Sequence, residues 1–279
     1  MPQANHTRII FITGTDTGVG KTLLTALLLC HLRQTGSPAL AIKPFCAGSR
    51  SDAELLHALQ DGELTLDEIN PFYFPEPLAP LVAARKQKRS IRLDDVLDQI
   101  RSVVLRRLPA AAGKALRHQS QKSKTKTLLV EGAGGLLVPL GENFTFLDLI
   151  STLTFTTRPG VIVVARNRLG TINHSLLTFR ALKSAAPRSG QRKRTQASSS
   201  RQSRLSIPPS ALDLVLMDHH SSRAASSNLS SASNPGLLAE WLAPIHVHTF
   251  PFLGSEPLNP RAIRQNAKRF SARLARILH

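Results

Sequence analysis

The sequence predicts an α/β fold in which helices cover both faces of a mostly parallel sheet. Short apolar runs rich in β-branched residues alternate along the chain with segments of helical periodicity. Such an alternation is typical of parallel strands buried between two layers of helices. The chain has 279 residues, of which 42% are hydrophobic, so it can bury a substantial core.

The elements are predicted in a regular order, each from its own residue pattern. Short β-branched runs such as RIIFIT and GVIVVAR predict the strands, and apolar residues at helical spacing predict the helices. Strands are predicted at 8–13, 39–45, 127–132, 160–166, 212–217 and 246–250. Helices are predicted at 20–34, 52–59, 93–108 and 263–278, with others between the later strands.

The net charge of +18 is confined to three stretches without acidic residues. These are residues 113–126, 183–206 and 257–279, and together they hold the whole excess of positive charge. The first two are rich in Ser, Gln, Lys and Arg, with almost no large apolar residue, which predicts solvated insertions rather than folded structure. We therefore predict a single domain over residues 1–279, with flexible insertions at 110–126 and 183–210.

The sequence shows neither a secretory or membrane signal nor a cysteine pattern typical of disulfides or zinc. No run approaches the ~20 apolar residues of a membrane span, and the first apolar stretch is too short for a signal peptide. Cys30 and Cys46 are too few for a disulfide framework or a zinc site. Cys30 is expected to be a buried small hydrophobe, and Cys46 a neighbour of the site without a chemical role. Cytoplasmic localisation is the expectation.

The most informative motif is FITGTDTGVGKT, residues 11–22. A strand runs into a glycine-bearing loop, and a helix begins at Gly20-Lys21-Thr22. Backbone N–H groups that wrap around an anion require a loop without bulky side chains, and the helix N-terminus adds its dipole. Lys21 would reach the β- and γ-phosphates of a nucleotide, and Thr22 would place its hydroxyl on magnesium. The motif predicts a P-loop.

The loop departs from the strict P-loop spacing, because Thr15 holds the first-glycine position and Gly14 stands one residue earlier. The string GTDTGVGKT resembles the phosphate loop of dethiobiotin synthetases. Asp16 stands where partition-type ATPases of the same superfamily carry a signature lysine, which argues against that group. Three further stretches extend the resemblance, namely IKPFCAGS at 42–49, LLVEGAGGLLVPL at 128–140 and RLGTINHSLLT at 168–178. The resemblance covers about residues 8–182 well and 211–255 loosely.

A metal site is predicted where a buried strand ends in Glu131. A carboxylate at the carboxyl end of such a strand points into the crevice where α/β sheets bind ligands, and burying it unpaired would be costly. A metal role is therefore favoured. The family resemblance implies that Thr22, Asp52 and Glu131 share a magnesium ion. It also implies that Lys43 acts with Lys21 on the transferring phosphoryl group.

The resemblance assigns further residues by their positions in the family motifs. Thr17 is implied as a catalytic hydroxyl contact, and the helix beginning near Thr171 is implied to bind the substrate carboxylate of the neighbouring subunit in a homodimer. His174 follows the pattern and is interpreted as structural. ATP binding is implied for Gly14, Thr15, Asp16, Gly18, Val19, Gly20, Lys21 and Thr22. Substrate binding is implied for Gly134, Gly135, Gly170, Thr171, Ile172 and Asn173.

At two positions the chain differs from the family pattern. Ala47 stands in place of a serine, which removes a hydroxyl from the substrate side. Met217 stands where the family places an asparagine that reads the adenine edge, and Asp218 follows it, so base preference is left open. Asp148, in FTFLDLI, is expected to cap or stabilise the loop after Glu131.

The reaction that the resemblance implies joins 7,8-diaminononanoate and carbon dioxide at the expense of ATP. One amine captures carbon dioxide as a carbamate, whose oxygen attacks the γ-phosphorus to give a carbamic–phosphoric anhydride. The second amine then closes a ureido ring and expels phosphate. The chain would be a ligase of biotin biosynthesis, with magnesium as its cofactor and no membrane partner.

Two other functions are less compatible with the sequence. A cobyrinate-type amidoligase would need a glutamine-hydrolysing domain with a nucleophilic cysteine, and neither cysteine lies in a nucleophile elbow. A nucleic-acid-associated P-loop ATPase would use the basic insertions, but the signature lysine of that group is missing and no aromatic residue lies within either insertion.

Overall fold

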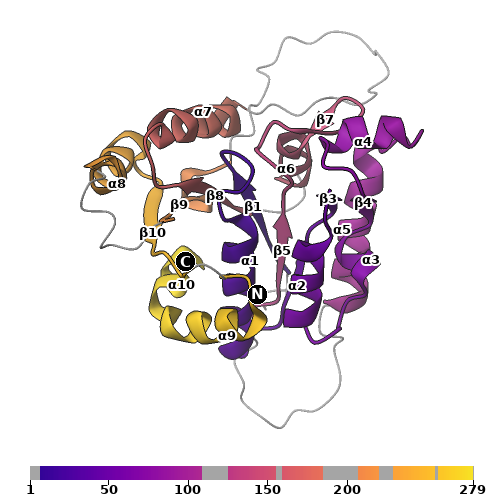
Figure 1. Cartoon of the computed structure of the whole chain (residues 1–279), viewed down its shortest axis with the longest axis horizontal. Coiled ribbons are helices and arrows are strands. Elements are labelled where there is room, and N and C mark those ends of the chain that lie inside the picture. The colour runs from indigo at the N-terminus through magenta and orange to yellow at the C-terminus, as the bar shows by residue number, and fades with distance from the viewer. Residues whose placement is uncertain are drawn as a thin grey trace, which may run out of the picture.

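The computed structural model describes residues 7–108, 125–154, 159–184, 207–219, 229–254 and 257–278. Within these residues the centre is a six-stranded parallel sheet in the order β10-β9-β8-β1-β5-β2 (Figure 1). Its strands are β1 (Arg8–Gly14), β2 (Ala39–Ile42), β5 (Thr127–Glu131), β8 (Gly160–Arg166), β9 (Leu212–Met217) and β10 (His246–Phe250). The predicted α/β fold with a parallel sheet is confirmed.

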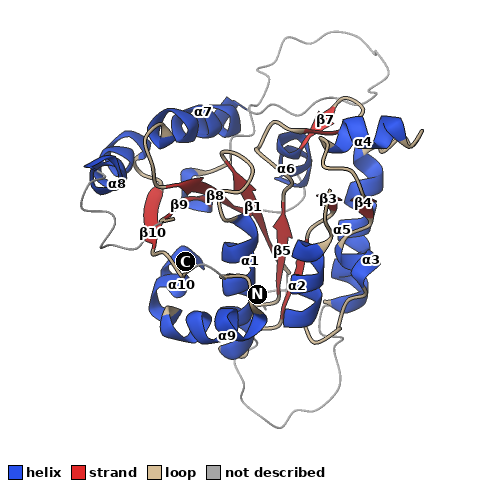
Figure 2. Cartoon of the chain, in the orientation of Figure 1, coloured by secondary structure: helices blue, strands red, loops and turns tan. Residues whose placement is uncertain are grey.

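Helices surround the sheet (Figure 2), and the burial of the strands shows that both faces are covered. Consecutive residues of β1 and β5 point to opposite faces, yet almost all of them are buried. Helix α1 lies against α2, α9 and α10, while α7 lies against α8. The helices are α1 (Lys21–Gln34), α2 (Ser51–Leu59), α3 (Leu66–Ile69), α4 (Pro80–Lys86), α5 (Leu93–Arg107), α6 (Phe146–Thr154), α7 (Thr171–Ser184), α8 (Leu229–Leu242), α9 (Pro260–Arg269), α10 (Ser271–Leu278) and the 3-10 turn η1 (Pro209–Ala211).

The position of β1 between β5 and β8 decides where ligands bind. Ile12 of β1 pairs with Glu131, and Gly14 pairs with Val164 of β8. The carboxyl ends of the three strands therefore meet at one edge, beside the loop that leads from β1 into α1. In open parallel sheets this edge is where ligands bind.

One predicted strand, 39–45, is divided in the structure. Strand β2 ends at Ile42, and β3 (Phe45–Ala47) pairs with β4 (Phe72–Phe74) in a separate two-stranded sheet. Pro44 has no N–H to continue the ladder, and the N–H of Lys43 donates to the carbonyl of Ile69 instead. The chain therefore turns away from the main sheet directly after Lys43.

The predicted C-terminal helix is also divided, into α9 and α10 with Phe270 between them. Each helix buries one apolar side, with Ile263 in α9 and Leu274 in α10 fully covered. The ring of Phe270 lies 5.3 Å from that of Phe250 at the end of β10. The break turns the second helix so that both apolar faces meet the same core.

Several local predictions can be compared with the structure. Cys30 is buried in α1, as expected. Asp148 caps the start of α6, because its carboxylate accepts hydrogen bonds from the backbone N–H and the hydroxyl of Thr145 at 2.8 and 2.7 Å. A short antiparallel pair, β6 (Pro139–Gly141) and β7 (Phe144–Thr145), precedes that helix.

Most of the two predicted insertions, 110–126 and 183–210, lies outside the described residues. At the edges that are described, Lys126 leads directly into β5 and Ile207 is buried against the core. Among the described helices, none has the length and apolar character needed to cross a membrane.

Candidate functional site

The phosphate loop joins β1 to α1 and takes its shape from two glycines. Gly18 and Gly20 have φ values of +68° and +102°, a region that side-chain-bearing residues rarely adopt. The N–H of Thr15 donates to the carbonyl of Val164 at 3.0 Å, which ties the start of the loop to β8. The ammonium of Lys21 donates to the carbonyl of Asp16 at 2.8 Å, across the mouth of the loop.

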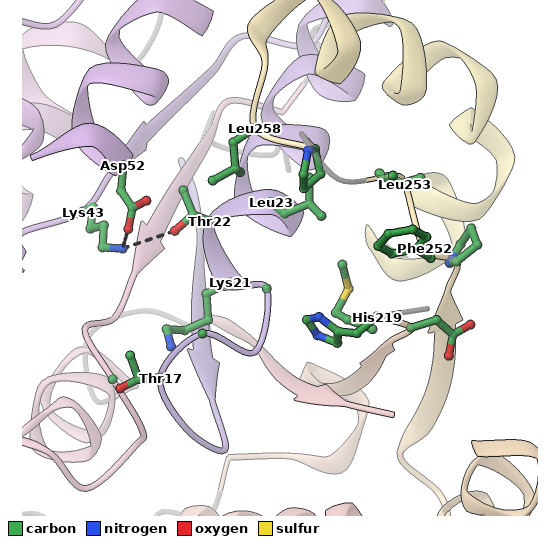
Figure 3. A pocket seen from close by; sticks show the side chains of 18 residues that line it. Thr17, Lys21, Thr22, Leu23, Lys43, Asp52, His219, Phe252, Leu253 and Leu258 are labelled. Atoms are coloured by element: carbon green, nitrogen blue, oxygen red, sulfur yellow. Dashed lines mark hydrogen bonds and ion pairs between the residues drawn. The ribbon is translucent and has the colours of Figure 1, made fainter. Parts of the chain in front are cut away.

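Side chains from α1, α2 and β5 meet beside this loop around Lys43, which directly follows β2. Its ammonium donates to Glu131 Oε1 at 2.8 Å. It also donates to the hydroxyl of Thr22 at 3.2 Å and forms an ion pair with Asp52 (Figure 3). The Thr22 hydroxyl in turn donates to Glu131 Oε1 at 2.6 Å. The structure therefore brings together Lys43 and the three predicted metal ligands.

Burial makes the charges of this cluster interdependent. Glu131 has no exposed surface and Lys43 is 7% exposed. Burial is the largest influence on the pKa of Lys43 and lowers it, but the carboxylates of Glu131 and Asp52 outweigh burial and hold the pKa above its ordinary value. The pKa of Lys21 is lowered to about 8, mainly because of burial, against the attraction of Glu131. Both lysines are therefore mainly charged at pH 7, but Lys21 loses its proton at a lower pH than Lys43.

The oxygen atoms around Lys43 could also hold a hard divalent cation. Thr22, Asp52 and Glu131 offer a hydroxyl and two carboxylates, the oxygen donors that such cations prefer. Glu131 Oε2 is buried without a hydrogen-bond partner in the described part of the chain, although its other oxygen is bonded. Among the described residues, no group of three or more His, Cys, Asp or Glu side chains is placed to hold a metal ion. The present set differs from such a group because it has two carboxylates and one hydroxyl.

Two cavities, each of about 410 Å³, meet at this cluster. The walls that they share are Thr17, Lys43, Asp52 and Gly134. The first cavity runs along the phosphate loop to an end where the apolar side chains of Met217, Phe252, Leu253 and Leu258 lie beside Asp218 and His219 (Figure 3). The second cavity is lined mainly by apolar side chains, namely Phe45, Cys46 and Ala47 of β3, Leu78 before α4 and Val138 before β6. The two spaces can therefore hold two different ligands on either side of one cation.

The remaining predicted substrate residues divide into two groups. Gly134, with φ of +69°, lines both cavities, and a Cβ on Gly135 would lie 3.5 Å from the carbonyl of Thr15. By contrast, Gly170, Thr171, Ile172 and Asn173 at the start of α7 line neither of these cavities. Thr171 instead borders a small hollow on the far side of the phosphate loop, and Asn173 is exposed.

Sequence reasoning missed one residue that contacts the loop. The guanidinium of Arg166, at the end of β8, donates from Nε and Nη2 to the carbonyl of Gly18 at 3.2 and 2.8 Å. Its position as the last residue of a buried strand was the available signal. Sequence reasoning also missed Leu258, which lines the end of the first cavity beyond Met217.

A glycine-shaped phosphate loop between β1 and α1, with Lys21 at its mouth, defines a P-loop enzyme that uses a nucleotide. Residues 8–190 match the family model described as "AAA domain". An ATP-dependent dethiobiotin synthetase of Anaeromyxobacter sp. (strain Fw109-5) is 42% identical over 180 residues, which are 63% of this chain and 71% of the relative. Another, of Methanocaldococcus jannaschii, is 35% identical over 175 residues, 63% of this chain and 73% of the relative. The chain belongs to the family of ATP-dependent dethiobiotin synthetases, which are ligases.

This membership confirms the family predicted from the motifs and favours it over the amidoligase and nucleic-acid alternatives. Among solved structures, the MinC:MinD cell division protein complex of Aquifex aeolicus aligns over 95% of this chain and 96% of that chain. Its TM-score is 0.47 and its identity 12%, and this likeness carries no argument about function.

Proposed function

We propose that this chain condenses 7,8-diaminononanoate with carbon dioxide and closes the ureido ring of dethiobiotin while ATP becomes ADP and phosphate. One observation carries the proposal. The ammonium of Lys43 stands where a cavity along the phosphate loop meets a second, apolar cavity. A cation at such a junction can stabilise a phosphoryl group that passes from a nucleotide on one side to an acceptor on the other.

In the proposed reaction, bonds form and break in three balanced steps. An amine of the substrate adds to carbon dioxide and loses a proton, which gives a carbamate. A carbamate oxygen bonds to the γ-phosphorus, and the bond to ADP breaks. The second amine bonds to the carbonyl carbon, loses a proton and expels phosphate. Lys21 and Lys43 neutralise charge on the transferring group, and Thr17, which lines both cavities, offers a hydroxyl to the carbamate.

Magnesium fits the oxygen donors of Thr22, Asp52 and Glu131, and the unsatisfied Oε2 of Glu131 supports that assignment. When bound, the ion would neutralise charge on the phosphate oxygens of ATP. The residues of this chain would hold it through one hydroxyl and two carboxylates. The apolar lining of the second cavity suits the aliphatic chain of a diamino acid, whose two amines would then face Lys43 and Thr17.

We further propose that the enzyme works as a homodimer. The substrate carboxylate would bind at the N-terminus of α7 of the neighbouring subunit, because that helix end lies away from both cavities of its own chain. Two apolar side chains beside it support a partner surface, since Leu169 is 84% and Leu177 54% exposed. Asn173, exposed between them, would add one hydrogen bond to the carboxylate.

The deciding experiment measures phosphate release from ATP by the purified chain with and without the diamine and bicarbonate. Release is expected to require both compounds, and mass spectrometry should detect dethiobiotin in proportion to ADP. A substrate analogue that lacks one amine serves as the control, because it can form a carbamate but cannot close the ring. Phosphate release that is indifferent to the diamine would refute the proposal.

A further inference from the structure

Strand β8 holds the phosphate loop at two points. At the start of the loop, the carbonyl of Val164 accepts the N–H of Thr15 at 3.0 Å. Near the tip, the guanidinium of Arg166 donates two hydrogen bonds to the carbonyl of Gly18. Because β8 is the direct neighbour of β1 in the sheet, both contacts come from the rigid core.

The contact with Arg166 depends on a glycine. Gly18 has a φ of +68°, and a Cβ at this position would lie 3.2 Å from Arg166 Nη2. A side chain would therefore strain the backbone and crowd the guanidinium. The hydrogen bonds from Arg166 of β8 therefore require a glycine at position 18.

The direction of this contact has a consequence for the next residue. In a planar trans peptide group the C=O and the N–H point in opposite directions. Since Arg166 binds the carbonyl of Gly18, the N–H of Val19 in the same peptide group points away from Arg166. Gly18, Gly20 and Lys21 line the cavity along the phosphate loop, whereas Arg166 and Val19 border a separate hollow, so the Val19 N–H points to the side opposite that hollow.

We propose that Arg166 is a positioning residue that turns the Gly18–Val19 peptide group so that the Val19 N–H faces the nucleotide phosphates. The inference rests on the proposed nucleotide site and adds a residue to it. Arg166 acts through the loop rather than on the reacting atoms, because its guanidinium is bound to the outward carbonyl. Its effect should therefore fall on nucleotide affinity and leave the affinity for the diamine unchanged.

The neighbouring Arg168 provides a matched control. It borders the same hollow and carries the same charge, but it makes no hydrogen bond to the described loop residues. A difference between Arg166→Gln and Arg168→Gln therefore reports the direct contact with the loop rather than the loss of a positive charge from the hollow as such.

The test measures ADP binding by calorimetry at fixed ionic strength, together with the KM values for ATP and the diamine. Arg166→Gln should weaken ADP binding about tenfold or more, the usual effect of losing a hydrogen bond from a charged group. Arg166→Lys, which keeps one charged donor, should recover part of the loss. Arg168→Gln should stay within about twofold of wild type, as expected of an exposed charge.

Three results would overturn the inference: wild-type ADP affinity in Arg166→Gln, equal losses in Arg166→Gln and Arg168→Gln, or a parallel rise in the KM of the diamine. If Arg166→Gln fails to fold, Arg166→Lys carries the same comparison with the control. A wild-type chain that binds no ADP would instead refute the proposed function, on which the inference rests.

Discussion

Replacing Lys43 by Met should destabilise the free enzyme, because it strands a buried carboxylate. Glu131 has no exposed surface, and its Oε1 accepts hydrogen bonds from Lys43 at 2.8 Å and Thr22 at 2.6 Å. Methionine preserves most of the apolar stem of the lysine, so the change removes little besides the ammonium. Breaking a buried ion pair at one partner typically costs about 3–5 kcal/mol of unfolding free energy.

The expected change in melting temperature follows from the size of the chain. At about 2–4 °C per kcal/mol for domains slightly smaller than this one, the loss corresponds to a Tm lower by roughly 6–20 °C. The raised pKa of Lys43 means that its stabilising charge is fully present below the unfolded pKa of about 10.5 and is lost only as pH rises through the folded value. The stability that the Lys43 ammonium contributes to wild type should therefore be constant between about pH 7 and about pH 9.

The assay is urea unfolding without nucleotide, with Lys86→Met as the matched control. Lys86 pairs with Glu76 at 2.7 Å, but both side chains are largely exposed, so its loss should cost about 0–1 kcal/mol. The double variant Lys43→Met with Glu131→Gln should be less destabilised than the sum of the two single changes, because no carboxylate is left stranded at position 131. Equal stability of Lys43→Met and Lys86→Met would refute this account of the cluster.

Three further predictions concern activity and reactivity. Lys21→Ala should lower turnover by about 100-fold or more without unfolding the chain, and near-normal turnover would contradict its role at the transferring phosphoryl group. In mixtures of Lys21→Ala chains with Asn173→Ala chains, activity should partly return, because one site of each mixed dimer keeps both residues. Native mass spectrometry verifies that the subunits have exchanged. No recovery of activity after exchange would mean that each chain builds its own site. Burial raises the pKa of the Cys46 thiol to about 12. Its alkylation by iodoacetamide, followed by peptide mass spectrometry, should therefore accelerate about tenfold per pH unit between about pH 7 and about pH 9. A plateau of the rate in that range would disprove the raised pKa.

Local signals determined most of the secondary structure of this protein. The β-branched runs of β1, β8, β9 and β10 were predicted nearly to the residue, because a buried strand is a short apolar run whatever its neighbours are. The same signal failed at 39–45, where the run continues through Pro44 although the ladder does not. Whether a strand stays in its sheet depends on the partner of each N–H, and the partner of Lys43 is Ile69, distant in sequence.

The shape of the phosphate loop could be predicted from the sequence because the spacing of its residues fixes its geometry. Gly18, Gly20, Lys21 and Thr22 lie on one loop and the first turn of one helix, so their order along the chain places them around an anion. Motifs at Lys43, Asp52 and Glu131 identified three more members through family resemblance. Sequence could not say that Lys43 bonds to both carboxylates and to Thr22, since those distances depend on how β2, α2 and β5 pack.

Tertiary structure alone decided three other features. It set Arg166 against the carbonyl of Gly18, a contact between residues 148 positions apart that no local pattern encodes. It brought Leu258 to the end of the first cavity beyond Met217, and it kept Asn173 away from both cavities of its own chain. The physical reason is the same in each case. Sequence patterns record how a segment meets its immediate neighbours and water, whereas the order of the strands in the sheet decides which distant ends meet.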